Sequence, residues 1–270
     1  MKTMKSKFYS LALAAGMLTL TACSDDNTND SNNDKGNGIE NGSTLKGTIT
    51  EDVTLKAGNT YKLSGEYIVE AGATLNIEEG VKIISIYDNI VDYILVKQGA
   101  KINAVGTPDK PIVMTSEKEE PGAWGGIHIC GKAHTNAEGG KGSSEIGGAV
   151  YGGNDDADNS GTLQYIRLEY TGFAFDEEHE ANGISFYGVG NGTIVDHCEA
   201  YKGSDDGFEF FGGSVNVSNM VVVSCSDDSF DWTEGWNGKG TDLVAYQEAK
   251  ATLGLSLIHI SEPTRPISIS

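Results

Sequence analysis

Two acidic segments in the last third of the chain repeat each other after 22 residues. The segment "SDDGFEF" at residues 204–210 is followed by "SDDSFDW" at residues 226–232, so three carboxylates in the first each have a counterpart in the second. The six residues are Asp205, Asp206, Glu209, Asp227, Asp228 and Asp231. Ca²⁺ takes six to eight oxygen ligands, and carboxylates are prominent among them. The spacing therefore predicts a calcium site wherever the fold brings the two segments together.

The same acids allow two other interpretations. Asn182, Asp206 and Asp228 each precede a glycine or a serine, and in turns such short polar side chains bond local backbone amides. Clustered carboxylates also act as acid and base in glycoside hydrolysis. Like charges opposite each other on neighbouring strands are destabilising. Water, amide hydrogen bonds, protonation or a cation must offset this repulsion.

A second candidate for cation binding is the segment "GGNDDADNSG" at residues 152–161. Asp156, Asp158 and Ser160 match positions 1, 3 and 5 of an EF-type calcium loop. Position 12 of such a loop is a glutamate, and here it is Arg167. This mismatch favours a polar insertion over a second metal loop.

Trp236, in "TEGWNGKG", is the candidate for contact with a glycan, because aromatic faces flank sugar rings and this tryptophan lies near the acidic repeats. The neighbouring Trp232 is expected to point inward. His128, His134, His179 and His197 lack the spacing of metal ligands and are expected at the surface or in turns.

The repeat extends beyond the acids. Val195, Cys198 and Ala200 fall on Val217, Met220 and Val222 at the same offset of 22, and residues 182–186 match residues 206–210 at 24. Closer to the N-terminus, "VEAGATLNI" recurs as "VKQGAKINA" after 27 residues. Self-similarity at such periods indicates a solenoid.

The residue types predict which solenoid forms. Short alternating runs are broken by Gly, Asn and Asp, and none of the runs has the longer periodicity of a core helix. We expect an all-β fold, a right-handed parallel β-helix with rungs of ~22 residues, stacked about 4.8 Å apart. Phe208 and Phe210 then point inward, and Glu209 lies above Asp231 on the outer face, with Ser185 continuing the column.

Several longer motifs resemble a known family. They are "PDKPIVMTS", "PGAWGGIHICGKA", "YGGNDDADNSGTLQYIRLEY" and "SDDGFEFFGGSVNV". They are similar to uncharacterised bacterial secreted lipoproteins with the right-handed β-helix of the pectin-lyase-like superfamily, over residues 44–254. The resemblance implies the fold and no particular reaction. Lyases of this fold use an arginine base, but by register Arg167 is expected to pair with Glu199.

The two ends of the chain differ from its middle. Residues 1–22 read as a signal peptide, and "LTAC", ending at Cys23, resembles the lipobox at which bacterial lipoproteins are cleaved and lipidated. Residues 23–43 are polar and are expected to form a disordered tether. Residues 44–254 are the expected β-helix. Residues 255–270 resemble the translation of a sequencing-adapter read-through, so we expect them to be an artefact that truncates the β-helix.

Composition limits the partners. The formal net charge is −20 and the isoelectric point about 4.5, which argues against a nucleic-acid partner. Apart from Cys23, the cysteines Cys130, Cys198 and Cys225 are an odd number and are expected to be small buried residues.

Taken together, these features favour a lipid-anchored protein of the outer membrane, facing the cell surface, that binds polysaccharide without catalysis and with bound Ca²⁺. The alternatives are a polysaccharide lyase or glycoside hydrolase that uses the acidic repeats, and a structural spacer. The sequence predicts no particular oligomeric state.

Overall fold

A computed structural model describes residues 38–175, 179–248 and 258–260. The first half of this structure contains the strands β1 (Gly38–Ile39), β2 (Thr44–Ile49), β3 (Val53–Leu55), β4 (Thr60–Val69), β5 (Thr74–Ile77), β6 (Lys82–Ser85), β7 (Tyr93–Val96), β8 (Lys101–Val105), β9 (Ile112–Ser116) and β10 (Ile127–Cys130). After these come the 3₁₀ turn η1 (Glu138–Gly140), β11 (Gly142–Ser143), β12 (Val150–Tyr151), β13 (Gly161–Glu169), β14 (Ile184–Tyr187), β15 (Ile194–Tyr201), β16 (Phe208–Phe211), β17 (Asn216–Val223), β18 (Phe230–Thr233), β19 (Gly240–Tyr246) and β20 (Ile258–Ile260). Apart from the β11–β12 hairpin, the paired strands are parallel.

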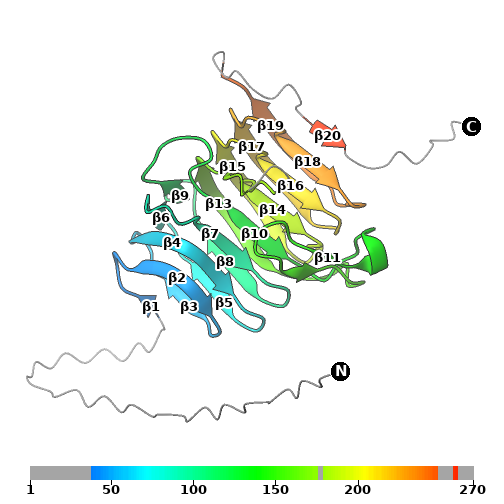
Figure 1. Cartoon of the computed structure of the whole chain (residues 1–270), viewed down its shortest axis with the longest axis horizontal. Helices are drawn as coiled ribbons and strands as arrows, with labels where there is room; N and C mark the ends of the chain where they lie inside the picture. Colours follow the sequence, from blue (N-terminus) through cyan, green and yellow to red (C-terminus); the bar gives the residue numbers. More distant parts are fainter. Residues whose placement is uncertain (1–37, 176–178, 249–257, 261–270) are drawn as a thin grey trace, which may run out of the picture. The chain divides into compact units, whose positions relative to one another are not determined.

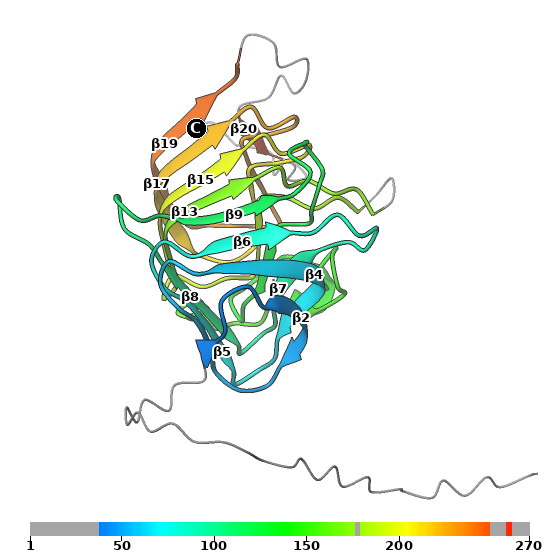
Figure 2. The same cartoon turned by 90° about the vertical axis from the view of Figure 1, so that its left-hand side faces the viewer.

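The strands stack in three columns, which form the three faces of a parallel β-helix. One column runs through β4, β6, β9, β13, β15, β17 and β19 (Figure 2). A second runs through β4, β7, β10, β14, β16 and β18 (Figure 1). The third contains β1, β3, β5, β8 and the first halves of β13, β15 and β17. The predicted parallel β-helix is confirmed.

The offsets seen in the sequence are the offsets between rungs. Phe208 pairs with Phe230 after 22 residues, Ile184 with Phe208 after 24, and Leu75 with Ile102 after 27. Longer steps occur where a loop is inserted: Ile127 of β10 pairs with Ile184 of β14. The repeats therefore arise because aligned residues occupy the same place on successive turns.

Strands β1 and β20 lie outside the range 44–254 that was expected to form the coil, and both pair with strands of the coil. Strand β1 lies within the range expected to be a tether and pairs with β3, so the coil begins before residue 44. Strand β20 lies within residues 255–270 and pairs in parallel with β18. The expected signal peptide and Cys23 lie outside the described residues. The described residues contain no helix with the length and hydrophobicity that a membrane-spanning segment requires.

Aromatic side chains fill the last rungs of the core. The ring of Phe186 stacks on Phe210 at 5.1 Å, Phe208 stacks on Phe230 at 5.8 Å, and Trp236 stacks on Phe210 at 4.6 Å. This confirms that Phe208 and Phe210 point inward. Cys130, Cys198 and Cys225 are buried and unbridged, as expected.

A second apolar cluster lies outside the coil. Residues between β10 and β13 pack over the outer side of β7, β10, β14 and β16; the cluster consists of Tyr93, Leu95, Cys130, Ile146, Ala149, Tyr151, Ala181, Tyr187 and Phe211. This insertion is fixed to the turn after β18, where Glu234 accepts hydrogen bonds from Thr135 Oγ1 at 2.6 Å and from Tyr151 Oη at 2.9 Å. The outer face of the second column is therefore covered.

His128 of β10 corrects one expectation. Its side chain is fully buried rather than at the surface, and its Nε2 lies 2.7 Å from the carbonyl oxygen of Gly125. Burial lowers the pKa of His128, and the contact with Gly125 raises it by a smaller amount, so that the pKa is about 4. His128 is thus a neutral member of the covered face.

Four strands bend at a residue with positive φ. Between the two halves of β13, β15, β17 and β19 stand Tyr165, His197, Asn219 and Asp242, with φ of 51°, 52°, 53° and 55°. A left-handed backbone costs most side chains about 1–2 kcal/mol and is least unfavourable for Gly, Asn and Asp. The stacked bends turn the chain from one face of the coil to the next.

Because His197 has positive φ, the stability of the protein should depend on whether the residue at this position is β-branched. We expect His197→Val to lower the free energy of unfolding by about 2 kcal/mol relative to His197→Asn, because a β-branched residue tolerates positive φ least. Both variants lose the stacking of His197 on Tyr165, so their difference isolates the backbone. Urea unfolding measures it, and equal stability of the two variants would contradict the assignment.

Candidate metal centre

Three stacked strands position the acidic repeats. On the outer side of the coil, Ser185 of β14 pairs with Glu209 of β16, and Glu209 pairs with Asp231 of β18. The predicted column is therefore present. It is built by parity: the residues on either side of Glu209 point into the aromatic core, so Glu209 must point out.

The turns that enter β16 and β18 hold the remaining acids in a backbone ladder. The amide of Gly183 donates to the carbonyl of Asp206 at 3.0 Å, and the amide of Gly207 donates to the carbonyl of Asp228 at 2.9 Å. Asp206 Oδ1 also accepts from the amide of Asp228 at 2.8 Å. This hydrogen bond joins one rung to the next. The interpretation of Asp206 as a turn residue predicts instead a hydrogen bond to a backbone amide of its own turn.

Five of the six acids form two overlapping groups. One oxygen each of Asp205, Asp206 and Asp227 lies within 4.8 Å of the others, and the same holds for Asp206, Glu209 and Asp231. Asp206 belongs to both groups. Asp228 belongs to neither, and its backbone amide binds Asp206. We call the first group the outer triad and the second the inner triad.

The two triads differ in their access to solvent. Asp227 of the outer triad is exposed and Asp205 is half-buried. In the inner triad, Asp231 is 7% exposed, and the shared Asp206 is 8% exposed. The centre therefore runs from solvent at Asp227 to the covered face at Asp231.

Burial and mutual repulsion make these carboxyls reluctant to ionise. Burial, followed by the charge of Asp205, raises the pKa of Asp206 to about 9. Burial, followed by the charges of Glu180 and Asp227, raises the pKa of Asp205 to about 7. The pKa of Glu209 is raised well above its ordinary value by burial and then by Asp206. The charges acting most strongly on these three groups are all carboxylates, so a proton or a cation must neutralise the site.

Asn182 completes the inner end of the centre. Its side chain is 1% exposed, and its Nδ2 donates to Glu209 Oε2 at 2.6 Å and to Ser185 Oγ at 3.1 Å. Its Oδ1 has no hydrogen-bond partner in the described structure. The sequence placed Asn182 in a turn, and its alignment with Asp206 was the only signal of this role.

Gly126 fixes the backbone beneath Asn182. Its φ is +65°, and a Cβ there would lie 2.1 Å from the carbonyl oxygen of Asn182. Only glycine fits this close approach, so the residues before β10 help to hold Asn182 against the acids.

The second candidate loop does not gather its oxygens. Asp156 accepts from the amide of His134 at 3.1 Å and lies 2.7 Å from His134 Nδ1, whereas the buried Asp158 accepts from Ser160 Oγ at 3.0 Å. Neither triad found among the described residues includes them. Their contacts favour the polar insertion over a metal loop.

Trp236 and Arg167, the two remaining candidates, are held by contacts within the protein. Trp236 is half-buried, with its ring on Phe210 and its Nε1 donating to the carbonyl of Val215 at 3.1 Å. Arg167 pairs with Glu199 at 3.6 Å, as expected, and with Glu169 at 2.6 Å.

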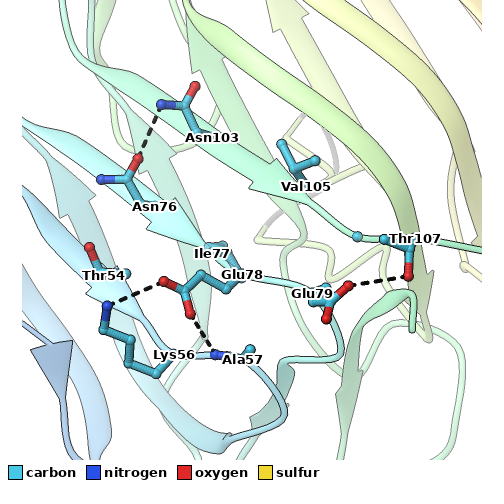
Figure 3. Close-up of a pocket in the computed structure, with 11 residues that line it drawn as sticks. Thr54, Lys56, Ala57, Asn76, Ile77, Glu78, Glu79, Asn103, Val105 and Thr107 are labelled. Atoms are coloured by element: carbon cyan, nitrogen blue, oxygen red, sulfur yellow. Dashed lines mark hydrogen bonds and ion pairs between the residues drawn. The ribbon is translucent and has the colours of Figure 1, made fainter. Parts of the chain in front are cut away.

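A separate groove of about 730 Å³ lies over β3, β5 and β8 (Figure 3). Its amides are linked, with Asn103 Nδ2 donating to Asn76 Oδ1 at 3.1 Å. Its charges are paired: Lys56 binds Glu78 at 3.3 Å, and Lys110 binds Glu79 at 2.8 Å. This groove therefore lacks the concentrated charge of the acidic centre.

Three columns of stacked parallel strands make this a parallel β-helix protein, and the acidic centre lies on the outer side of one column. The chain matches the model of the family described as pectate-lyase like beta helix domain over residues 47–270, and it belongs to that family. No curated protein and no solved structure matches the chain.

Proposed function

We propose that the protein is a non-catalytic, calcium-containing binding protein of the cell envelope whose ligands are polysaccharides. The observation that carries the proposal is the pair of acidic triads that share Asp206. Carboxylates and the Asn182 amide oxygen are hard donors, which suit Ca²⁺ better than softer transition metals. Bound Ca²⁺ offsets the repulsion within the column and joins three rungs of the coil.

Polysaccharide as the ligand class is supported by the family, whose description refers to pectate lyase. Binding is favoured over lyase chemistry because Arg167, the one arginine among the described residues, is engaged by Glu169 and Glu199 and lies over the ring of Tyr201 at 4.6 Å. An arginine held in this way is a poor base.

Attachment to the outer membrane is part of the proposal and depends on Cys23. Two or more acyl chains anchor a protein stably where one is marginal. Metabolic labelling with palmitate tests this step: label should enter the chain and be absent from Cys23→Ala. Labelling that survives the substitution would contradict it.

Calcium-dependent glycan binding is the functional prediction. On an array of acidic and neutral polysaccharides, the chain should bind with Ca²⁺ present and lose at least tenfold in affinity with chelator or as Asp231→Asn. No product should be released. The exposed Asp109 gives a matched control, and Asp109→Asn should bind like the unchanged chain. Binding that is equal with and without Ca²⁺ would contradict the proposal.

One observation favours an alternative, glycoside hydrolysis. Asp206 holds its proton at neutral pH because its pKa is about 9, and it lies beside the exposed Asp227, as a general acid lies beside a carboxylate base. New reducing ends that vanish in Asp206→Asn would support this alternative. Their absence across acidic and neutral glycans would exclude it.

A further inference from the structure

We infer that the acidic centre holds two adjacent cations, one in each triad, with the carboxylate of Asp206 bridging them. The inference rests on the proposed calcium site and adds the number of ions, their ligands and their difference in solvent access.

The distances argue against one ion for all five acids. Ca²⁺ binds oxygens at 2.3–2.6 Å, so the ligands of one ion lie within about 5 Å of one another. The oxygens of each triad meet this limit, at 4.8 Å or less, but no group in the described structure joins Asp227 to Glu209 or Asp231. A single ion would leave one end of the column uncompensated. Two ions give each of these five acids a cation.

Asp206 is placed to bridge. It is the only member common to both triads, and a carboxylate has two oxygens with about four acceptor positions. The Asp228 amide uses one position on Oδ1, which leaves Oδ2 and a second position on Oδ1 for cations. Paired metal ions in proteins lie about 3.5–4 Å apart, a separation that one carboxylate can span.

Asn182 is an independent sign of an inner ligand. A buried polar atom without a partner is rare, and Asn182 Oδ1 is such an atom at 1% exposure of the side chain. The same carboxamide lies against Glu209 at 2.6 Å. Its oxygen and nitrogen exchange places by rotation about the last side-chain bond. After rotation, the oxygen faces the inner triad as a neutral fourth ligand.

The two ions should differ in hydration. The outer triad contains the exposed Asp227, so the outer ion keeps water ligands and exchanges with solvent. The inner triad lies against the covered face, with Asp231 at 7% exposure and Asn182 at 1%. The inner ion is therefore the more completely coordinated by protein and the slower to leave.

Titration of the chelated full-length chain with Mn²⁺, followed by electron paramagnetic resonance, tests the inference, since Mn²⁺ also prefers oxygen ligands. We expect two equivalents to bind and a spin-coupled signal to appear with the second. Asp227→Asn should bind one equivalent without coupling and weaken the outer site at least tenfold. Asp231→Asn should retain only the outer ion, and Asp206→Asn should lose both. Asp109→Asn is the control.

The outcomes separate the inference from the proposed function. One bound ion in the unchanged chain, or two that never couple, overturns the paired arrangement and leaves the calcium site standing. Failure to bind any Mn²⁺ or Ca²⁺ overturns both. If a variant misfolds, as judged by circular dichroism, the stoichiometry and coupling of the unchanged chain still decide the matter.

Discussion

Asp206→Asn should stabilise the cation-free chain at alkaline pH by about 2 kcal/mol or more and abolish its binding of Ca²⁺. Burial raises the pKa of the Asp206 carboxyl from its ordinary value of 3.8 to about 9, so the folded state keeps this proton until about pH 9. Between these values the folded state binds more protons than the unfolded state, so stability falls as pH rises. Each tenfold difference in proton affinity is worth about 1.4 kcal/mol. Asparagine cannot ionise, so the free energy of unfolding of the variant lacks the part of the decline that Asp206 causes.

Urea unfolding with chelator at pH 7 and pH 9 measures the effect. The pKa of His128 is lowered to about 4, so its contribution changes only below about pH 6.5. His134, whose pKa is raised, and the buried Cys130, Cys198 and Cys225, whose pKa values are raised to about 12, are the same in all three chains. The difference between the chains therefore reports on Asp206. The unchanged chain and Asp109→Asn should lose stability from pH 7 to pH 9, and Asp206→Asn should lose much less. Added Ca²⁺ should restore the stability of the unchanged chain and of Asp109→Asn at pH 9, and it should not change the stability of Asp206→Asn. A cation-free chain that gains stability over this interval would show that Asp206 is ionised in the fold.

Phe210→Ala should lower the free energy of unfolding by about 3–5 kcal/mol, the range for truncating a buried phenylalanine. Phe210 is 2% exposed and lies between Phe186 at 5.1 Å and Trp236 at 4.6 Å. Its loss opens a cavity that two flat rings cannot fill. Since Glu209 precedes it on the same strand, the variant should also weaken the cation site.

Tyr87→Ala is the comparison for this prediction. Tyr87 is 65% exposed, and surface substitutions usually change stability by no more than about 0.5 kcal/mol. Guanidinium unfolding of both variants gives the difference. A Phe210→Ala chain as stable as Tyr87→Ala would mean that the stacked core is not formed.

The stacking of the acids could be predicted because side chains alternate along a strand. Aromatic residues at 208, 210 and 230 fix which positions face inward, and a slip of one residue would put charges in the core. The offset of 22 then places Asp231 beside Glu209 without knowledge of the rest of the chain, and the structure has this pairing.

The burial of that column could not be predicted. It depends on the insertion between β10 and β13, which interrupts the repeat and packs Ile146 and Tyr151 against Tyr187. Periodicity describes contacts between successive rungs, whereas these contacts join segments with no shared period. His128 was misplaced because alternation along the strand does not show that the outer face is covered here; its ring lies 6.1 Å from that of Tyr93 and 6.3 Å from that of Tyr187.

Two local features were also hidden from the pattern. Residues 38–43 contain one bulky apolar residue, Ile39, and so resemble the tether before them, yet β1 pairs with β3 and Asn41 Oδ1 accepts from the amide of Thr60 at 2.9 Å. The contact of Asn182 with Glu209 spans 27 residues between side chains. The pairing of β1 and the contact of Asn182 cannot be predicted from the alternation of side chains along a strand, because both depend on where turns end.

Calorimetric titration of the chelated chain with Ca²⁺ is the decisive experiment on the acidic centre. We expect saturable binding below millimolar Ca²⁺ that is absent from Asp206→Asn and intact in Asp109→Asn. A folded chain that takes up no Ca²⁺ at millimolar concentrations would contradict it, and the acidic column would then be a protonated element of the β-helix.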